Sequence, residues 1–332
     1  ARILIKLNCS YEFYPLIFSD FQFLKQLKYE RIHTFMIMDN DNNLRQLLSN
    51  GYVLAPCIYD CLSARSAELC GFKALMLSGC ALAWSMIGMP DIGLLTADEL
   101  VDATTRITDS CSLSLLVDAD EGYGESPLNC YRTSKRLVKA GAAALQIDDS
   151  TGIRGYERVI TGGVHPILDE KAFVGKIRAA KAATEGSNCI IIGRTIALRK
   201  LGVDAAIERC HLALDAGADM TLVLGLNNMD DCIRVAKEVP GWKMYPDITT
   251  TNGKADVSVK EIASLGFNLI TMHYAEYGAM WGMMYYGTEN YKNENCEFSD
   301  NHAMGGLSWP ERWNQLSPHY LEWLQHEKEW SE

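Results

Sequence analysis

The chain of 332 residues is 48% hydrophobic and 22% charged, an ordinary globular composition with enough apolar material for a core. Its net charge of -11 is opposite in sign to the basic face expected of a nucleic-acid binder. No apolar run reaches the roughly 20 residues that span a bilayer, so neither nucleic acid nor a membrane is expected as a partner. The length suits two average domains or one α/β barrel with additional segments.

The 11 cysteines are odd in number, contain no Cys-x-x-Cys pair and lie mostly in apolar or amphipathic segments. Disulfide frameworks and zinc sites use regular spacings, which are missing here. We interpret most of these cysteines as buried thiols in a reducing compartment, and we therefore expect a cytoplasmic location.

The N-terminal segment is rich in Phe, Leu, Tyr and Lys but has no clear hydrophobic period. It also lacks the compact apolar core and small-residue cleavage site of a signal peptide. We predict that residues 1–43 form an N-terminal extension, of which residues 1–35 lie outside the main fold.

From about residue 50, short apolar runs alternate with amphipathic helical stretches. The expected strands are Tyr52–Pro56, Ala74–Leu77, Ser114–Asp118, Ala144–Ile147, Cys189–Gly193, Met220–Leu224, Lys243–Tyr245 and Leu269–Met272. Expected helices include Tyr131–Ala140, Glu170–Thr184, Val203–Ala216 and Val257–Leu265, and Thr96 with Glu99 forms a capping box that opens another.

This alternation predicts parallel strands joined by right-handed crossovers. Eight such units favour a (β/α)8 TIM barrel, here over residues 44–290, and no glycine-rich phosphate loop follows the first strand as it would in a dinucleotide-binding sheet.

After the last strand we expect a Met- and aromatic-rich helix over Tyr274–Tyr286. A second helical region, Trp309–Trp330, lies in the C-terminal tail of residues 291–332. Its many tryptophans predict docking on the barrel or on a partner subunit.

In such barrels the active site lies at the C-terminal ends of the strands. The residues there are Ser78, Gly79 and Cys80, Asp118 and Asp120, Asp148 and Asp149, Arg194 and Thr195, Asp247, and His273. Taken singly, Asp148 could be a loop cap and His273 a core histidine. As a set, these acids, one arginine and one histidine predict a site.

The most informative stretch is Leu115–Gly124, an apolar strand that ends in two carboxylates, Asp118 and Asp120. Like charges this close repel unless a cation lies between them, and oxygen ligands favour Mg²⁺ or Mn²⁺. The alternative is that these aspartates only start a turn. A metal beside the buried guanidinium of Arg194 suits a small 2-oxo acid, because both stabilise the enolate that forms when a neighbouring C–C bond breaks.

Five segments resemble, in order and spacing, the signatures of the isocitrate lyase/phosphoenolpyruvate mutase superfamily. They are Ala74–Gly79, Gly88–Gly93, Leu116–Gly124, Ile147–Asp149 and Gly193–Thr195. The resemblance covers residues 44–290 and implies a (β/α)8 barrel, Mg²⁺, and dimers or tetramers formed by exchange of a C-terminal helix. It further implies metal ligands and substrate contacts. Asp118, Asp120 and Asp148 would surround the metal, partly through water, while Ser78, Gly79, Cys80 and Arg194 would bind substrate, with Asp91 near the site.

Several positions depart from the superfamily pattern. Lyase members carry a Lys-Arg/Lys-Cys-Gly-His loop after the fourth strand, whose cysteine is an acid/base, but residues 151–165 contain no cysteine. The acidic position ending the sixth strand is Leu224, the metal-site glutamate is shortened to Asp148, and the asparagine-containing mutase loop is absent. The oxaloacetate decarboxylase branch resembles this chain most, since it shares the missing cysteine, the apolar Leu222–Gly225 and the run His273-Tyr274-Ala275.

Three functions are compatible with these residues. The first is Mg²⁺-dependent decarboxylation of oxaloacetate or a 3-alkyl derivative, with Arg194 orienting the substrate and His273 or Tyr123 assisting proton delivery. The second is a carbon–carbon lyase of the methylisocitrate or dimethylmalate type, in which Tyr156, Glu157 or His165 replaces the cysteine. The third is a barrel that keeps the fold and the metal but has lost catalysis. The glycine-rich loop of residues 152–164 is expected to act as a lid.

Overall fold

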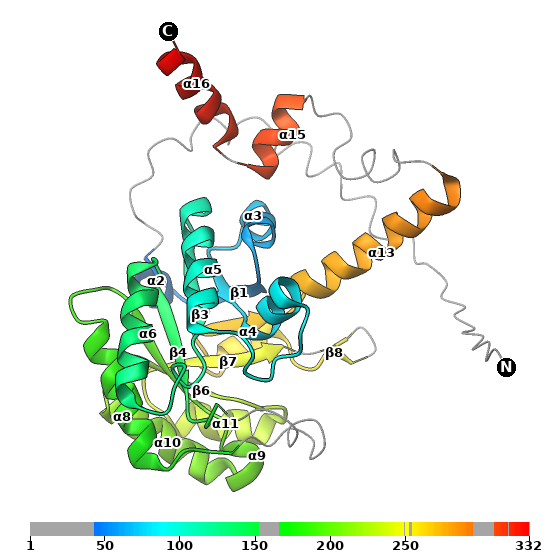
Figure 1. Ribbon diagram of the computed structural model, residues 1–332. Helices are drawn as coiled ribbons and strands as arrows, with labels where there is room; N and C mark the ends of the chain where they lie inside the picture. Colours follow the sequence, from blue (N-terminus) through cyan, green and yellow to red (C-terminus); the bar gives the residue numbers. More distant parts are fainter. Residues whose placement is uncertain are drawn as a thin grey trace, which may run out of the picture. The chain divides into compact units, whose positions relative to one another are not determined.

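Eight parallel strands close into a barrel in the computed structural model, which describes residues 43–152, 166–248, 250–251, 254–294, 309–317 and 319–331. Around the barrel the order is β1-β10-β7-β6-β5-β4-β3-β2 (Figure 1). The predicted (β/α)8 TIM barrel is confirmed. Residues 1–35 and almost all of the predicted lid, with Tyr156, Glu157 and His165, lie outside the described residues. The barrel strands are Val53–Ile58 (β1), Ala74–Leu77 (β2), Ser114–Asp118 (β3), Ala144–Asp148 (β4), Ile190–Thr195 (β5), Met220–Val223 (β6), Trp242–Ile248 (β7) and Leu269–Met272 (β10).

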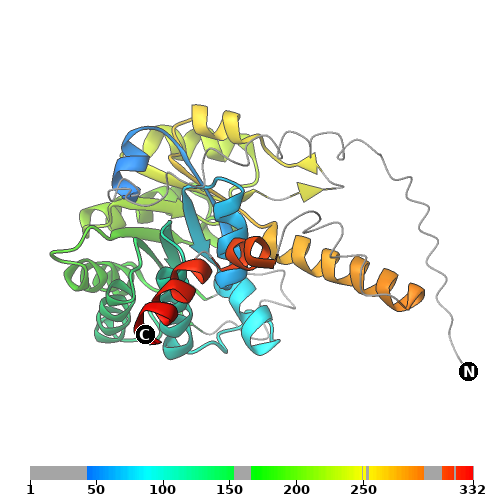
Figure 2. The same cartoon turned by 90° about the horizontal axis from the view of Figure 1, so that it is seen from above.

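Helices connect the strands and surround the barrel (Figures 1 and 2). The short strands Thr250–Thr251 (β8) and Lys254–Ala255 (β9) pair with each other outside the barrel. None of the described helices is both long and apolar enough to cross a membrane. The helices are Leu44–Ser49 (α2), Cys61–Leu69 (α3), Gly79–Leu82 (α4), the π-helix Ala83–Ile87 (η1), Ala97–Ser110 (α5), Pro127–Lys139 (α6), Glu170–Ala183 (α8), Leu198–Leu201 (α9), Val203–Asp215 (α10), Met229–Glu238 (α11), Val259–Ser264 (α12), Ala275–Asn293 (α13), Trp309–Leu316 (α15) and Tyr320–Ser331 (α16).

Alternate residues of each strand point into the barrel and out toward the helices, as the period of two requires. On β5, Ile190 and Ile192 join the apolar cluster inside the barrel, whereas Ile191 packs with the helices outside. The helix α2, which the sequence analysis did not predict, adds Leu44 and Leu48 to the inner cluster near the strand N-termini. The barrel interior is therefore a packed apolar core, and the cavity lies above it at the C-terminal mouth.

The strand β7 runs to Ile248, three residues beyond its predicted end at Tyr245. The prediction stopped at Pro246, because proline cannot donate to a sheet ladder. The pairing of β7 with β10 shifts register between Tyr245 and Ile248, which places Pro246 at an irregularity where no donor is needed. At this shift β7 contains one residue more than the paired stretch of β10. Strict alternation from Met244 would turn Asp247 outward, but the extra residue lets Asp247 join the lining of the barrel mouth.

The predicted C-terminal helical region consists of two helices in the described residues, α15 and α16. The Nε of Arg65 on α3 donates a hydrogen bond of 2.9 Å to the backbone oxygen of Gln315 in α15. The helix α13, which begins three residues after β10, has no buried residue.

A partly buried ionic clamp ties three segments together at the N-terminal end of the barrel. Asp219 precedes β6 and accepts hydrogen bonds of 3.0 Å from Arg45, from Lys181 and from the backbone N–H of Ile191. Burial raises the pKa of Asp219, but these donors outweigh burial and hold the pKa below its ordinary value. A carboxyl group with a depressed pKa stabilises the fold above its unfolded pKa, and this stabilisation is lost as the pH falls.

We predict that Asp219→Asn lowers the free energy of unfolding at pH 7 by about 2 kcal/mol, because hydrogen bonds from charged donors are lost. Urea unfolding should give a difference from wild type that shrinks as the pH falls below about 4. The exposed Asp215, at the end of α10, provides the control Asp215→Asn, which should change little. Equal effects of the two variants would contradict this account.

Candidate active site at the barrel mouth

A small cavity of about 40 Å³ lies at the C-terminal end of the barrel. It is lined by side chains from all eight strands or the residues that directly follow them, so each strand contributes one part of its wall. The lining residues are Cys57, Met76, Ser78, Asp118, Gln146, Arg194, Leu222, Leu224, Met244, Pro246, Asp247, Thr271 and His273. A space of this size holds about three water molecules, which suits a compact polar ligand.

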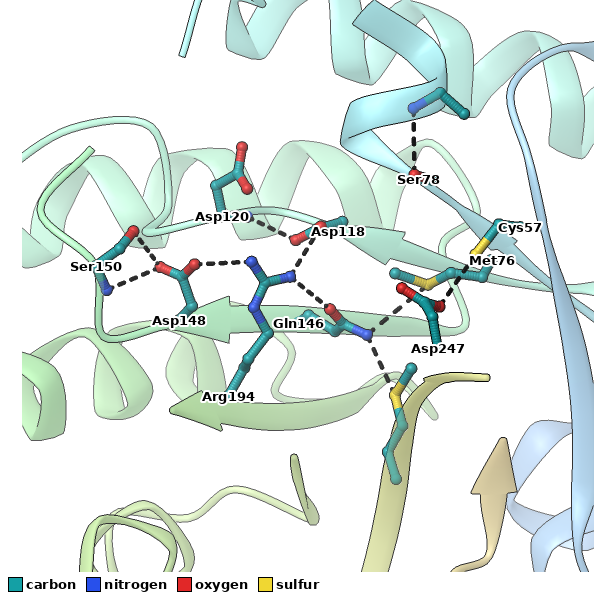
Figure 3. A network of polar contacts seen from close by, with 12 residues as sticks. Cys57, Met76, Ser78, Asp118, Asp120, Gln146, Asp148, Ser150, Arg194 and Asp247 are labelled. Carbon is teal, nitrogen blue, oxygen red and sulfur yellow. Dashed lines mark hydrogen bonds and ion pairs between the residues drawn. The ribbon is translucent and has the colours of Figure 1, made fainter. Parts of the chain in front are cut away.

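Arg194 holds one wall of the cavity together (Figure 3). Its Nη1 donates to the Oδ2 of Asp118 at 2.9 Å and to the Oε1 of Gln146 at 3.1 Å. Its Nη2 donates to the Oδ2 of Asp148 at 3.0 Å. The other oxygen of Asp148 accepts hydrogen bonds from the backbone N–H and the hydroxyl of Ser150. One planar guanidinium thus fixes acceptors on two neighbouring strands, β3 and β4.

The strand period of two explains why these groups meet. Ile190, Ile192 and Arg194 are spaced two residues apart along β5. Because the two isoleucines point into the barrel, the side chain of Arg194 points inward as well. The neighbouring Asp149 points outward instead, where its carboxylate accepts from Thr195 at 2.6 Å and from Arg209 at 3.0 Å. Asp148 therefore belongs to the site, and Asp149 belongs to a buried structural ion pair.

The turn after β3 directs the second carboxylate of the predicted metal pair. Asp120 has a positive φ of 49°, which is uncommon for a residue other than glycine. The buried Lys176 of α8 holds this turn, since its Nζ donates to the backbone oxygens of Glu121 and Gly124 at 2.6 and 2.7 Å. A side chain at Gly122 would collide with Cys130 of α6, so the turn can pack closely only with glycine there.

Asp118 and Asp120 converge on the backbone of Gly79 at the start of α4. A Cβ built on Gly79 would lie 3.9 Å from the Oδ2 of Asp118 and 4.0 Å from the Oδ2 of Asp120. Glycine keeps this space open, and oxygen donors face it from one side. Asp148 is linked to the pair through the backbone, where its N–H donates to the oxygen of Asp120 at 2.8 Å. Such a set of oxygen donors fits a hard cation such as Mg²⁺ or Mn²⁺.

The opposite wall carries a histidine held between two carboxylates. The Nε2 of His273 lies 3.0 Å from the Oδ2 of Asp247, and its Nδ1 contacts the Oε1 of Glu276. Burial lowers the pKa of His273, but these two contacts outweigh burial and raise the pKa to about 10. The imidazole is therefore charged at neutral pH. The thiol of Cys57 donates to the Oδ1 of Asp247 at 3.5 Å, and burial with the nearby negative charges raises the pKa of this thiol.

Five of the predicted site residues line the cavity, namely Ser78, Asp118, Arg194, Asp247 and His273. The others lie beyond the lining. Gly79, Asp120 and Asp148 are adjacent to it through the contacts described above. Cys80 lies in α4, Asp91 lies in the segment between η1 and α5, and Tyr123 packs against the hydrophobic core outside the barrel. Tyr156 lies outside the described residues.

The sequence analysis missed three polar groups of the site, and each left some signal. Gln146 is the one polar residue inside the apolar stretch Ala144–Ile147, and it is fully buried at the mouth. Cys57 follows Val53 and Ala55 on the inward face of β1, so the period of two places it in the barrel. Glu276 lies three residues after His273, within reach once α13 begins at Ala275.

We predict that Arg194→Met lowers the free energy of unfolding by about 3 kcal/mol, because three buried acceptors lose their cation. Urea denaturation at pH 7 measures the effect. The exposed Arg178 on α8 offers the matched variant Arg178→Met, which should stay within about 0.5 kcal/mol of wild type. If both variants are equally stable, the guanidinium does not organise this wall.

A family model described as phosphoenolpyruvate phosphomutase matches residues 44–291, well over half of the chain. The 2-methylisocitrate lyase of Salmonella typhimurium is 43% identical over 157 residues, 46% of this chain and 51% of that protein. The oxaloacetate decarboxylase of a Bradyrhizobium species is 36% identical over 203 residues, 59% of this chain and 68% of that protein. A crystal structure of 2,3-dimethylmalate lyase superposes with a TM-score of 0.72 at 26% identity, over 90% of this chain and all of that one.

The fold and the carboxylate–arginine site therefore define a (β/α)8 barrel protein of the lyase and mutase type. The chain belongs to the phosphoenolpyruvate mutase/isocitrate lyase superfamily. It spans about half the length of the 2-methylisocitrate lyases of Salmonella typhimurium and Escherichia coli that it matches. The resemblance inferred from the sequence motifs is confirmed.

Proposed function

We propose that this chain is a divalent-metal-dependent lyase of a small 2-oxo dicarboxylate, and that its reaction is decarboxylation of the oxaloacetate type. The observation that carries the proposal is the position of Arg194. Its guanidinium is held by Asp118, Gln146 and Asp148 in a cavity suited to a compact ligand. The relatives that are named lyases or decarboxylases add support.

Asp118, Asp120 and Asp148 would hold the metal, which would supply Lewis-acid chemistry at the 2-oxo group. Mg²⁺ and Mn²⁺ both suit these oxygen donors. A solved structure of the same fold, a phosphonopyruvate hydrolase, is a complex with oxalate and Mg²⁺. Ser78, Gly79 and the adjacent Cys80 receive the substrate carboxylate in this proposal, and the superfamily resemblance adds Asp91.

Decarboxylation breaks the bond between carbon 3 and the distal carboxylate. Carbon dioxide leaves, the bonding electron pair passes to the 2-oxo group as an enolate, and a proton then returns to carbon 3. Arg194 stabilises the negative charge that develops on the enolate oxygen. His273 is the proton donor that the geometry favours over Tyr123, because its charged ring lines the cavity while Tyr123 packs against the outer core. No thiol acid is needed for this sequence of steps.

A carbon–carbon lyase of the methylisocitrate or dimethylmalate type is the second candidate. The 43% identity to 2-methylisocitrate lyase favours it. In that reaction Tyr156, Glu157 or His165 would replace the missing cysteine. Full lyase activity in a Tyr156→Phe variant would eliminate Tyr156 from that role.

We predict that the protein with Mg²⁺ converts oxaloacetate to pyruvate faster than Mg²⁺ alone does, and that a chelator abolishes the difference. Asp118→Asn should lower kcat/KM by about 100-fold, because it removes a metal ligand and a partner of Arg194. The exposed Asp109 of α5 supplies the control Asp109→Asn. Cleavage of a methylisocitrate-type substrate alone would favour the second candidate. Metal binding without turnover across a panel of 2-oxo acids would point to a barrel that has lost catalysis.

We further propose that the chain forms a dimer or tetramer by exchanging its C-terminal helix. The exchanged segment is the tail of residues 291–332, and the helix α13 that leads into it supports an interface here, because it carries exposed Tyr277, Met280, Trp281, Met283 and Met284. Exposed apolar groups at this density are typical of an interface.

The free thiols of the described ranges support our proposal of a reducing, cytoplasmic compartment.

We predict that the double variant Trp281→Glu with Met284→Glu yields a smaller species than wild type in size-exclusion chromatography with light scattering. Charges on this face would have to be desolvated in the interface. Leu128 on α6 is equally apolar and exposed, so Leu128→Glu is the control and should keep the wild-type mass. A wild-type monomer would refute helix exchange.

A further inference from the structure

The wall of the cavity that faces Arg194 brings together a thiol, a carboxylate and an imidazole. Cys57 comes from the end of β1, Asp247 from β7 and His273 from the residue after β10, and these three strands are neighbours in the barrel. The Sγ, a carboxylate oxygen and a ring nitrogen all lie within 4.8 Å of one another. In the described ranges this is the one group of three such residues with metal-binding spacing. None of the three belongs to the predicted Mg²⁺ set.

We propose that Cys57, Asp247 and His273 form a second metal site, selective for Zn²⁺ or a similar divalent ion of intermediate softness. The residue types decide the class of metal. Thiolate and imidazole are poor partners for Mg²⁺, which prefers oxygen, whereas sulfur, nitrogen and oxygen together are the ligands of zinc. The two walls of one cavity thus differ in the ions they select.

The distances agree with a tetrahedral ion. Zinc bonds of about 2.3 Å to sulfur and about 2.1 Å to nitrogen and oxygen put a sulfur–oxygen edge near about 3.6 Å and a nitrogen–oxygen edge near about 3.4 Å. The Sγ of Cys57 lies 3.5 Å from the Oδ1 of Asp247, and the Nε2 of His273 lies 3.0 Å from the Oδ2 of the same carboxylate. Both separations are close to these edges, and a small turn of the carboxylate would present one oxygen to the sulfur and the nitrogen together. All three residues line the cavity, so a fourth position faces a water or a small ligand.

Glu276 provides the outer hydrogen-bond partner that zinc-bound histidines use. Its Oε1 contacts the Nδ1 of His273, which leaves Nε2 as the ligand atom. Such carboxylate–histidine pairs fix the ring and raise its basicity. The second oxygen of Glu276 is buried and has no hydrogen-bond partner among the described residues.

The local charge also favours a cation. Two carboxylates, Asp247 and Glu276, lie against the single ring of His273. Within the described ranges neither carboxylate pairs with a lysine or an arginine. The ring of His273 can carry only one positive charge for these two carboxylates, so this wall keeps a net negative charge that attracts a cation.

The test is a titration of the metal-free full chain with Co²⁺ in the presence of excess Mg²⁺, which occupies the oxygen-only site. We expect one Co²⁺ per chain with visible d–d bands and a near-ultraviolet thiolate-to-cobalt charge-transfer band, and Zn²⁺ should displace it. Cys57→Ser should remove the charge-transfer band. Glu276→Gln should keep the band but weaken binding about 10- to 100-fold.

Cys189, a buried cysteine just before β5, provides the matched control, and Cys189→Ser should retain the full band. The absence of a charge-transfer band in wild type, or its persistence in Cys57→Ser, would overturn the site. Circular dichroism of each variant establishes that it is folded.

These readouts require no turnover, so they can fail or succeed independently of the proposed decarboxylation. If that function holds, zinc should also inhibit it, because the ion occupies the Nε2 of the proton donor, and Cys57→Ser should need at least tenfold more zinc for the same inhibition. Equal inhibition of Cys57→Ser and Cys189→Ser would show that zinc acts elsewhere.

Discussion

The guanidinium of Arg194 is the contact on which the site depends. It lies on β5 and donates to acceptors on β4 and β3, so three neighbouring strands end in one hydrogen-bonded plane. Without it, Asp118 and Asp148 would stand as buried like charges at the barrel mouth. Its rigid fork explains why arginine and not lysine suits this position. The same plane sets the orientation of the carboxylates that we assign to the metal.

The closed strand order divides the mouth into two walls with different chemistry. The strands β3, β4 and β5 supply oxygen donors and a fixed cation, whereas β1, β7 and β10 lead to a thiol, a carboxylate and a charged imidazole. Apolar Leu222 and Leu224 separate the two walls on the side of β6. This spacing keeps the charged imidazole of His273 away from Arg194 and leaves room between them for a small anionic ligand.

Local deviations from regular structure complete both walls. The register shift at Pro246 brings Asp247 into the mouth, and the left-handed turn at Asp120 aims a second carboxylate toward Gly79. Lys176 of α8 stabilises that turn, and Gly122 within the turn lets it pack closely against Cys130 of α6. Each deviation is supported by packing at some distance along the chain, which is why motif spacing alone does not reveal it.

The sequence by itself determined the barrel, its eight strands, and the inward position of Asp118 and Arg194, because strand period and alternation with helices are local patterns. It also identified the superfamily. Only the tertiary structure decided that Arg194 bridges Asp118, Gln146 and Asp148, that Asp149 turns away, and that Cys57, Asp247 and His273 meet. The Arg194 contacts need β3, β4 and β5 side by side, and Cys57 and Asp247, 190 positions apart, meet only because barrel closure places β1 beside β10 and β10 beside β7.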